Sequence, residues 1–127
     1  MINGKDLEDM GYYEMFDSDG KPKNPFAAYS QWVEGKMLTK GMDRQIENTL
    51  GLVGEAGEVA EKIKKVIRDQ NRFSNEEILK ELGDVLFYTA ALANFYGGTL
   101  QQVAEMNIEK LDSRQKRGTL KGNGDNR

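Results

Sequence analysis

Proline limits what this sequence can form, because a proline inside a helix removes a hydrogen bond and clashes with the preceding turn. The chain has 127 residues and two prolines, Pro22 and Pro25, so its last 102 residues contain none. Apolar residues recur there at helical spacing. They predict helices over about residues 26–41, 43–69, 74–96 and 99–116. The predicted fold class is therefore all-α, a four-helix bundle-like protomer.

Capping signals mark where two of these helices begin. Ser74 with Glu77, and Thr99 with Gln102, have the spacing of capping boxes. The glycine pair at 97–98 ends the helix between them. These limits divide the chain into a loop-rich N-terminal extension (1–24), one all-α domain (25–116) and a basic, glycine-rich C-terminal tail (117–127).

The predicted helix over 74–96 is apolar on nearly every side in its second half. Between Val85 and Tyr96 only Thr89 and Asn94 are polar. A helix of this kind has to be covered all round. Three other helices of one small chain hardly suffice, so we expect an oligomer, a homodimer or a homotetramer. A central core helix in a monomer is the alternative.

Missing residue types exclude several kinds of site. The chain has no histidine and no cysteine, which rules out Ser-His-Asp or Cys-His nucleophiles and Cys/His zinc sites. The absence of disulfides is compatible with a cytoplasmic location, and the N-terminus shows no signal peptide. The charge-free run over 85–104 is broken by Gly97–Gly98 and Gln101–Gln102, so we expect no membrane span. A net charge of −3 with scattered basic residues indicates no nucleic-acid partner.

Two pairs of carboxylates stand out on neighbouring helices. Glu55 and Glu58 are three residues apart, as are Glu81 and Asp84, so each pair shares one helix face. Antiparallel packing across the short connection would let the pairs converge beside the apolar stripes. Ionised carboxylates crowded together in this way repel, and a divalent cation relieves that repulsion. Oxygen ligands alone select a hard ion, Mg²⁺ or Mn²⁺.

A solvated acidic face is the competing interpretation of these carboxylates. Lys62 follows Glu58 by four residues, and Lys80 precedes Asp84 by four, so ordinary surface ion pairs are available. The presence of two such pairs beside apolar stripes leaves both interpretations open.

Three glycines repeat at every third position of the second predicted helix. Gly51, Gly54 and Gly57 each cost about 1 kcal/mol relative to alanine inside a helix. Their clustering indicates a close backbone approach, either by another helix or by a ligand.

The combined motif resembles that of the MazG-like all-α nucleoside triphosphate pyrophosphohydrolases. Gly54-Glu55-Ala56-Gly57-Glu58-Val59 is followed by Glu81-Leu82-Gly83-Asp84-Val85, with 22 residues between Glu58 and Glu81. This matches the family pattern of E-x-x-E, a spacer, then E-x-x-D. Asn107, Lys110 and Arg114 are similar to the N-x-x-K-L-x-x-R element that often follows. The likeness covers about residues 25–116 and is strongest to small, stand-alone bacterial and phage-type members. Gly54 stands where the family often has a second glutamate, a departure that also occurs in this subgroup.

The resemblance implies Mg²⁺-dependent hydrolysis of a (d)NTP to (d)NMP and pyrophosphate, with Mn²⁺ as an alternative ion. It makes Glu55, Glu58, Glu81 and Asp84 the catalytic metal ligands, without saying which carboxylate acts as the base. Without histidine, water activated by the cation is the available nucleophile. Six further residues are candidates for substrate binding: Lys65, Tyr88, Asn107, Lys110, Arg114 and Trp32. For these the competing interpretations are a solvated lysine cluster, a plain polar surface stripe and a core tryptophan.

Three functions therefore remain open from the sequence. The first is a (d)NTP pyrophosphohydrolase that clears or recycles nucleotides. The second is a non-catalytic helical scaffold or regulatory protein that keeps the same fold. The third is hydrolysis of another nucleotide phosphoanhydride. If the protein is a (d)NTP pyrophosphohydrolase, a basic tail is expected to close over the triphosphate through Lys116, Arg117, Lys121 and Arg127. A disordered tail is the alternative.

Overall fold

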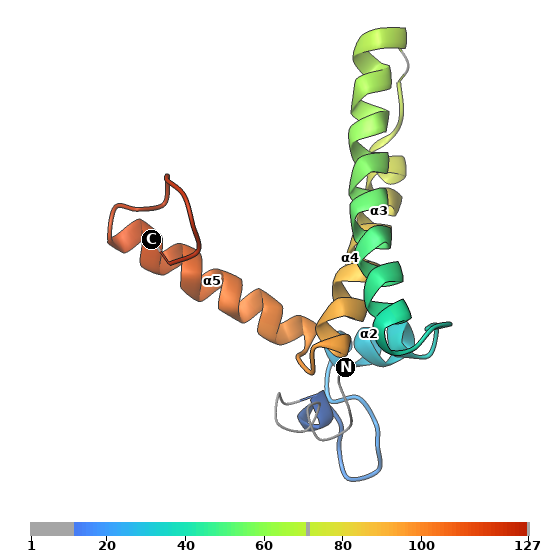
Figure 1. The fold of residues 1–127 in the computed structure, drawn as a ribbon, viewed down its shortest axis with the longest axis vertical. Coiled ribbons are helices and arrows are strands. Elements are labelled where there is room, and N and C mark those ends of the chain that lie inside the picture. Colours follow the sequence, from blue (N-terminus) through green and yellow to red (C-terminus); the bar gives the residue numbers. More distant parts are fainter. Residues whose placement is uncertain (1–11, 71, 127) are drawn as a thin grey trace.

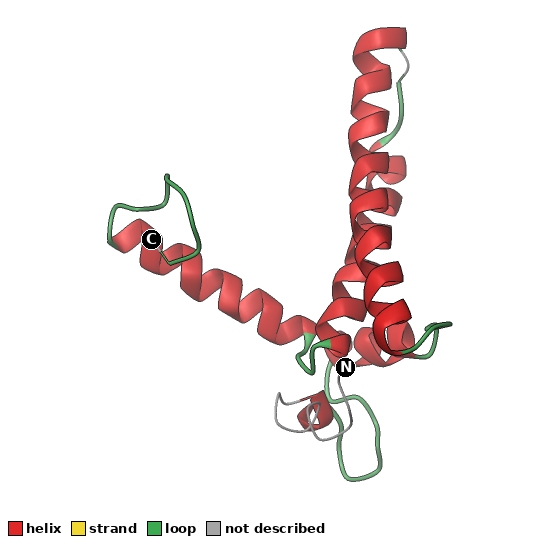
Figure 2. Ribbon diagram, viewed as in Figure 1, coloured by secondary structure: helices red, strands yellow, loops and turns green. Residues whose placement is uncertain are grey.

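The computed structural model describes residues 12–70 and 72–126. A short 3₁₀ helix and four α-helices make up its regular structure (Figure 1): η1 (Tyr12–Met15), α2 (Pro25–Glu34), α3 (Gly41–Asp69), α4 (Asn75–Phe95) and α5 (Leu100–Lys116). Over these ranges there is no strand, only an isolated bridge between Phe16 and Pro22 (Figure 2). The predicted all-α class with four main helices is confirmed. Of the predicted N-terminal extension, residues 1–11 lie outside the described residues.

Side-chain caps begin three of the helices. Ser74 and Glu77 form a reciprocal capping box at α4, as predicted. Thr99 and Gln102 form the second predicted box, at α5. At α2 the Asn24 side chain accepts a hydrogen bond from the Ala27 N–H, and Pro25 fills the first position, which needs no donor.

Helix α2 is shorter than its apolar stripe predicts. It ends at Glu34, with Gly35 as its C-cap, instead of continuing to about residue 41. Gly41, at φ +58°, then lets the chain turn sharply into α3, which begins there and not at Asp43. Met37 still packs on the core from outside the helix. The stripe therefore identified a buried segment correctly but not the end of the helix.

The four helices meet at one end of the molecule. Helices α3 and α4 form a long antiparallel hairpin, α2 packs against the base of α4, and α5 diverges from the hairpin as a separate arm (Figure 1). The buried core at this junction consists of Val33, Ala90, Ala91 and Leu100, with Tyr29, Met37 and Phe87 packed against it.

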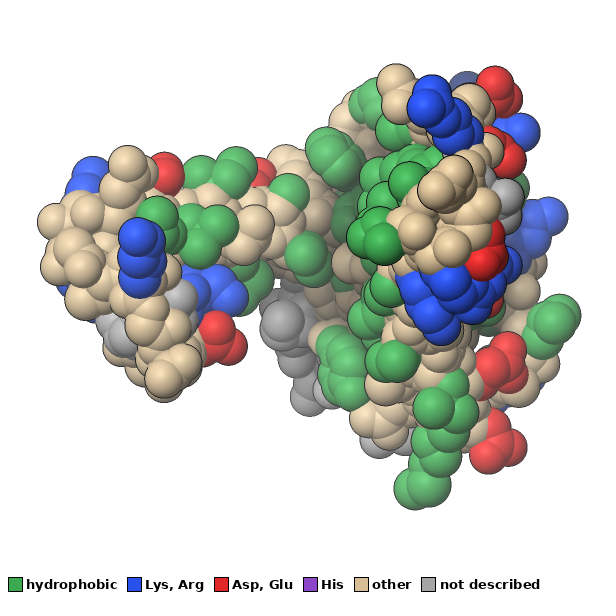
Figure 3. Space-filling model, turned by 90° about the horizontal axis from the view of Figure 1, so that it is seen from above, with side chains coloured by type: hydrophobic (Ala, Val, Ile, Leu, Met, Phe, Trp, Pro, Cys, Tyr) green, Lys and Arg blue, Asp and Glu red, His purple; other side chains and the backbone are tan. Residues whose placement is uncertain are grey.

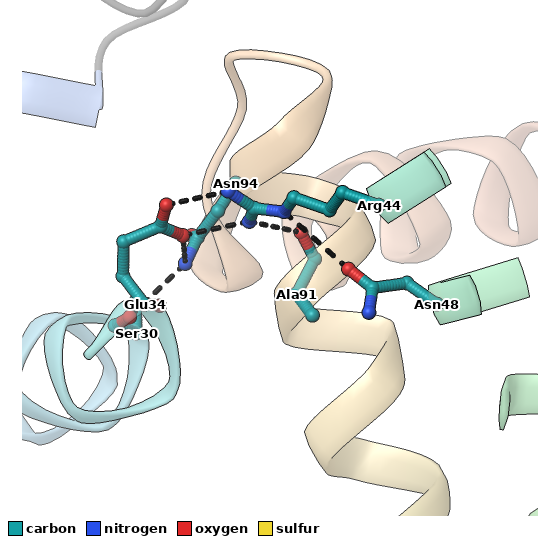
Figure 4. Close-up of polar contacts among 6 residues, drawn as sticks. All are labelled: Ser30, Glu34, Arg44, Asn48, Ala91 and Asn94. Atoms are coloured by element: carbon teal, nitrogen blue, oxygen red, sulfur yellow. Dashed lines mark hydrogen bonds and ion pairs between the residues drawn. The ribbon is translucent and has the colours of Figure 1, made fainter. Parts of the chain in front are cut away.

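A polar network fastens α2 and α3 to α4 next to this core (Figure 4). Arg44 donates to both carboxylate oxygens of Glu34, at 2.6 and 2.7 Å, and to the Ala91 carbonyl at 3.2 Å. The Asn94 amide donates to the Ser30 carbonyl at 3.0 Å and to Glu34 at 3.1 Å. Because bidentate, charge-assisted bonds are directional, this network fixes how the three helices meet.

Large apolar side chains remain exposed along the hairpin and the arm. In Figure 3 they gather on the side of the hairpin that faces α5, and along α5 itself. On α4, the helix that the sequence singled out, Leu79, Leu82 and Leu86 are exposed, whereas residues 87–95 are buried or half-buried. Most uncovered residues belong instead to α3 and α5: Met42, Ile46, Leu50, Val53, Ile63, Val66, Ile67, Val103, Met106, Ile108 and Leu111. Exposed apolar surface of this extent is typical of interaction surfaces.

Among the described residues, every helix falls short of the length or the apolar character that a membrane crossing requires.

Candidate metal and nucleotide site

Three of the four predicted carboxylates come together between α3 and α4. One carboxylate oxygen each from Glu55, Glu81 and Asp84 lies within 4.8 Å of the others. Glu55 comes from α3, whereas Glu81 and Asp84 are one turn apart on α4. Glu55 and Glu81 are half-buried, and Asp84 is exposed. We call these three residues the acidic cluster.

The acidic cluster carries uncompensated negative charge. Burial raises the pKa of Glu55, and the charges of Asp84, Glu81 and Glu58 raise it further. Within the described chain, the ion pair from Lys62 Nζ to Glu81, at 3.5 Å, is the only one that reaches the cluster. One lysine therefore faces three carboxylates.

This donor set fits a divalent cation. Closely spaced carboxylate oxygens, without nitrogen or sulfur donors, are the ligands that hard cations prefer. A doubly charged ion would also remove the repulsion that raises the pKa of Glu55. Glu55, Glu81 and Asp84 are thus the residues positioned to hold such an ion.

Glu58 lies beside the acidic cluster and not within it. It is exposed on α3, one turn from Glu55, and its charge still acts on Glu55. The surface ion pairs considered from the sequence are also different in the structure. Lys62 pairs with Glu81 and not with Glu58, and Lys80 pairs with Glu76 and not with Asp84.

Aromatic side chains lie next to the acidic cluster. Tyr88, one turn beyond Asp84, packs where a Cβ at Gly51 would clash with its ring, so Gly51 is required for this close contact. Gly54 and Gly57 have open space around the position of a Cβ. Trp32 is 53% exposed and stacks edge-on with Phe87, at 5.8 Å between ring centroids. It is therefore not a core tryptophan.

Tyr29 is a neighbour of the acidic cluster that the sequence analysis assigned only to a helical stripe. Burial raises the pKa of its hydroxyl, and the charge of Asp84 adds to the shift. Its ring lies 5.7 Å from that of Trp32, three residues later on α2. The spacing of Tyr29 and Trp32 was the available signal, but only the packing of α2 against α4 shows that they lie near an acidic residue.

The remaining predicted contacts lie away from the acidic cluster. Lys65 is exposed on α3, and its charge acts on Asp69. On α5, Asn107 and Lys110 are exposed and line an open hollow of about 1040 Å³ between α4 and α5. Arg114 is buried, at 4% exposure. Helix α5 packs on α2 and α4 only near the junction, so this protomer does not bring its polar stripe to the acidic cluster.

Comparison with known proteins identifies the family. Residues 44–119 match the MazG nucleotide pyrophosphohydrolase domain. The chain belongs to this family. The match contains all four predicted carboxylates and the α5 stripe, whereas Trp32 precedes it. Family members generally use divalent metals, and the acidic cluster provides a place for one.

A phage protein is a relative of this chain. Gene 37 protein of Mycobacterium phage L5 is 47% identical over 83 residues, which is 62% of this chain and 73% of the relative. Its name states no activity. No solved structure matches this chain.

Proposed function

We propose that this protein is a Mg²⁺-dependent pyrophosphohydrolase that converts a (d)NTP to (d)NMP and pyrophosphate, and so clears or recycles nucleotides. The observation that carries the proposal is the acidic cluster, three carboxylates within 4.8 Å of one another inside the region that matches the family. We assign the activity to residues 25–116. Residues 1–24 and 117–127 flank this domain, and a cytoplasmic location stays a prediction.

The carboxylates have two roles in this proposal. Glu55, Glu81 and Asp84 would hold Mg²⁺, or Mn²⁺ in its place. The ion supplies positive charge that offsets the charge on the phosphate oxygens and acidifies water. Hydrolysis breaks the bond between the α- and β-phosphates, and the attacking water gives up a proton. We propose that Glu58, which lies one turn from Glu55 and outside the acidic cluster, accepts this proton.

Nucleotide contacts come from the aromatic and basic residues in this proposal. The exposed ring of Trp32 offers a surface on which a base can stack; Phe87 lies edge-on to it, and Tyr88 lies edge-on to Phe87. Lys65, Asn107, Lys110 and Arg114 would contact the phosphates and the sugar. Arginine and lysine suit this role because charge-assisted hydrogen bonds to phosphate are strong.

A homodimer or homotetramer is part of the proposal. It is supported by the exposed apolar side chains on α3 and α5, which a second copy would cover. It is also supported by the position of Asn107, Lys110 and Arg114. Since α5 leads away from the hairpin of its own protomer, this stripe would serve the acidic cluster of a neighbouring copy.

Phosphorus NMR of a panel of dNTPs and NTPs incubated with the protein and Mg²⁺ tests the proposed reaction. We expect (d)NMP and pyrophosphate. Nucleoside diphosphate and orthophosphate would contradict the proposed bond cleavage. No turnover of the triphosphates would favour a scaffold, or another phosphoanhydride such as a nucleotide-sugar if that substrate is cleaved instead.

A further inference from the structure

The C-terminal segment turns back on α5 instead of leading away from it (Figure 1). Helix α5 ends in a Schellman motif: the Thr119 N–H donates to the Arg114 carbonyl at 2.8 Å, and the Gly118 N–H donates to the Gln115 carbonyl at 3.2 Å. Gly118 has φ +70° and Gly124 has φ +84°, conformations that favour glycine. The glycines of this segment therefore favour the turns that bring it back to α5.

The returning segment places an acidic side chain on two basic residues of α5. Asp125 Oδ1 lies 3.2 Å from an Arg114 guanidinium nitrogen and 3.3 Å from Lys110 Nζ. The same Arg114 nitrogen donates to the Gly124 carbonyl at 3.1 Å. The two basic groups hold the pKa of Asp125 below its usual value. Asp125 therefore stays ionised and paired at neutral pH.

The two side chains of this ion pair differ in how far they are buried. The Arg114 side chain is 5% exposed, whereas the Asp125 side chain is 82% exposed. Arg114 is thus buried where the returning segment meets α5, whereas the Asp125 side chain lies at the surface of this contact. The Arg114 Nε is also buried, and it has no hydrogen-bond partner among the described residues. A guanidinium can bind two oxygens of one anion, so the present contact uses only part of its capacity.

A carboxylate between a lysine and an arginine occupies the place that a phosphate group would take. Ion pairs with a largely exposed partner are weak, so Asp125 is displaceable. A di- or triphosphate carries more charge and more acceptor oxygens than one carboxylate. We propose that Asp125 is an internal competitor, which occupies Lys110 and Arg114 until the phosphates of an anionic ligand displace it.

This inference rests on the proposed function in one respect, that Lys110 and Arg114 contact substrate phosphates. It adds that the C-terminal segment regulates phosphate binding. The ligand must be concentrated enough to displace Asp125 from Lys110 and Arg114. The basic tail predicted from the sequence to close over the triphosphate therefore also carries the residue that competes with it. Of the four basic residues in that prediction, Arg127 lies outside the described residues.

Calorimetric titration of the full-length protein with inorganic pyrophosphate tests the competition. We expect Asp125→Asn to tighten pyrophosphate binding by about 3–10-fold, the factor that corresponds to two weak ion pairs. Asp112→Asn is the matched control, because it removes the same charge from an exposed position of α5. It should change the affinity by less than twofold. Equal affinities in Asp125→Asn and Asp112→Asn would overturn the proposal.

A second substitution separates competition from a structural role. Asp125→Asn should tighten pyrophosphate binding less in the Lys110→Met variant than in the unmodified protein. The Lys110→Met variant has already lost one of the two ion pairs of Asp125. If Asp125→Asn only lowers the melting temperature and leaves the affinity unchanged, the contact is structural and the proposal fails.

Turnover is measured separately, so the two proposals fail independently. If Asp125→Asn tightens pyrophosphate binding in a protein that cleaves no triphosphate, the competition stands and the proposed hydrolysis falls. If triphosphates are cleaved and Asp125→Asn has the same pyrophosphate affinity and KM as Asp112→Asn, the hydrolysis stands and the competition falls.

Discussion

In our proposal the hairpin and the arm carry two parts of one nucleotide site, and these parts are assembled in different ways. On the hairpin, Glu55 meets Glu81 and Asp84 because α3 and α4 pack along their lengths. On the arm, the side chains of Lys110 and Arg114 pair with Asp125 of the protein's own C-terminal segment. One protomer thus brings three carboxylates together by itself, whereas in our proposal the phosphate contacts of α5 need a ligand and a neighbouring copy.

The largest effect should come from removing a carboxylate of the acidic cluster. Asp84→Asn should lower kcat/KM by about 10²–10³-fold, the cost typical of losing one group that stabilises charge in a transition state. Initial rates of pyrophosphate release measure it. Glu76→Gln, which changes an exposed acid of α4 that pairs with Lys80, is the control and should keep near-normal activity. Comparable losses in the two variants would refute the assignment of the cluster.

Glu58 should matter less than the residues of the acidic cluster if its place beside the site is correct. Glu58→Gln should lower kcat by about 10–100-fold, as substitutions next to a metal site do, and leave Mn²⁺ affinity nearly unchanged. A loss of Mn²⁺ binding as large as that of Asp84→Asn would make Glu58 a ligand instead.

The separation between hairpin and arm predicts complementation between subunits. Lys110→Met should lower kcat/KM by about 10-fold or more, since hydrogen bonds to charged groups are worth about 1.5–3 kcal/mol. The Lys110→Met and Asp84→Asn variants should recover part of the activity when they are unfolded and refolded as a mixture. Some mixed oligomers then combine an intact acidic cluster from one copy with an intact Lys110 from the other. Lys21→Met, at an exposed position of the loop before α2, is the control for Lys110→Met. Sedimentation that shows a monomer, or mixing that restores nothing, would place both halves within one protomer.

Two glycines of α3 allow a test of packing inside the hairpin. Gly51→Ala should destabilise the fold by about 1–3 kcal/mol, because its Cβ would displace Tyr88. Gly57→Ala meets open space and should stabilise α3 by up to about 1 kcal/mol. Urea denaturation measures both. If Gly57→Ala destabilises the protein as much as Gly51→Ala, then a second copy covers that face.

The smallest effect concerns the raised pKa of Glu55. A carboxylate with a raised pKa is bound to a proton more readily in the folded state, so the metal-free fold gains stability as pH falls through that pKa. Glu55→Gln should therefore raise the metal-free melting temperature at pH 7, by about 2–4 °C, and flatten its pH dependence. Thermal unfolding between pH 4 and 8 tests this, with Glu76→Gln as control. A lower melting temperature would contradict the repulsion inferred for the cluster.

Local rules explain why much of the hairpin could be predicted. Ser74 and Thr99 mark helix starts through contacts with residues three positions later, which the sequence contains directly. Glu81 and Asp84 share a face because the spacing within a helix is fixed. A short connection made α3 and α4 antiparallel, and this was enough to predict that carboxylates converge.

Features that depend on how helices cross could not be predicted in the same way. Spacing puts Glu55 and Glu58 on one face, but the crossing of α4 decides that only Glu55 joins the acidic cluster. The proximity of Tyr29 to Asp84 depends on how α2 packs. The direction of α5 depends on the corner at Gly97, where φ is +75°. The contact of Asp125 joins residues that no helical spacing connects.

Titration of Mn²⁺ into the protein at pH 7.5, followed calorimetrically, tests the central claim most directly. We predict saturable binding that the Glu55→Gln/Asp84→Asn double variant weakens by at least about 10-fold. The charge-matched double variant Glu76→Gln/Asp112→Asn should bind Mn²⁺ as the unmodified protein does. Equal Mn²⁺ affinity in the two double variants would show that the acidic cluster is not the metal site.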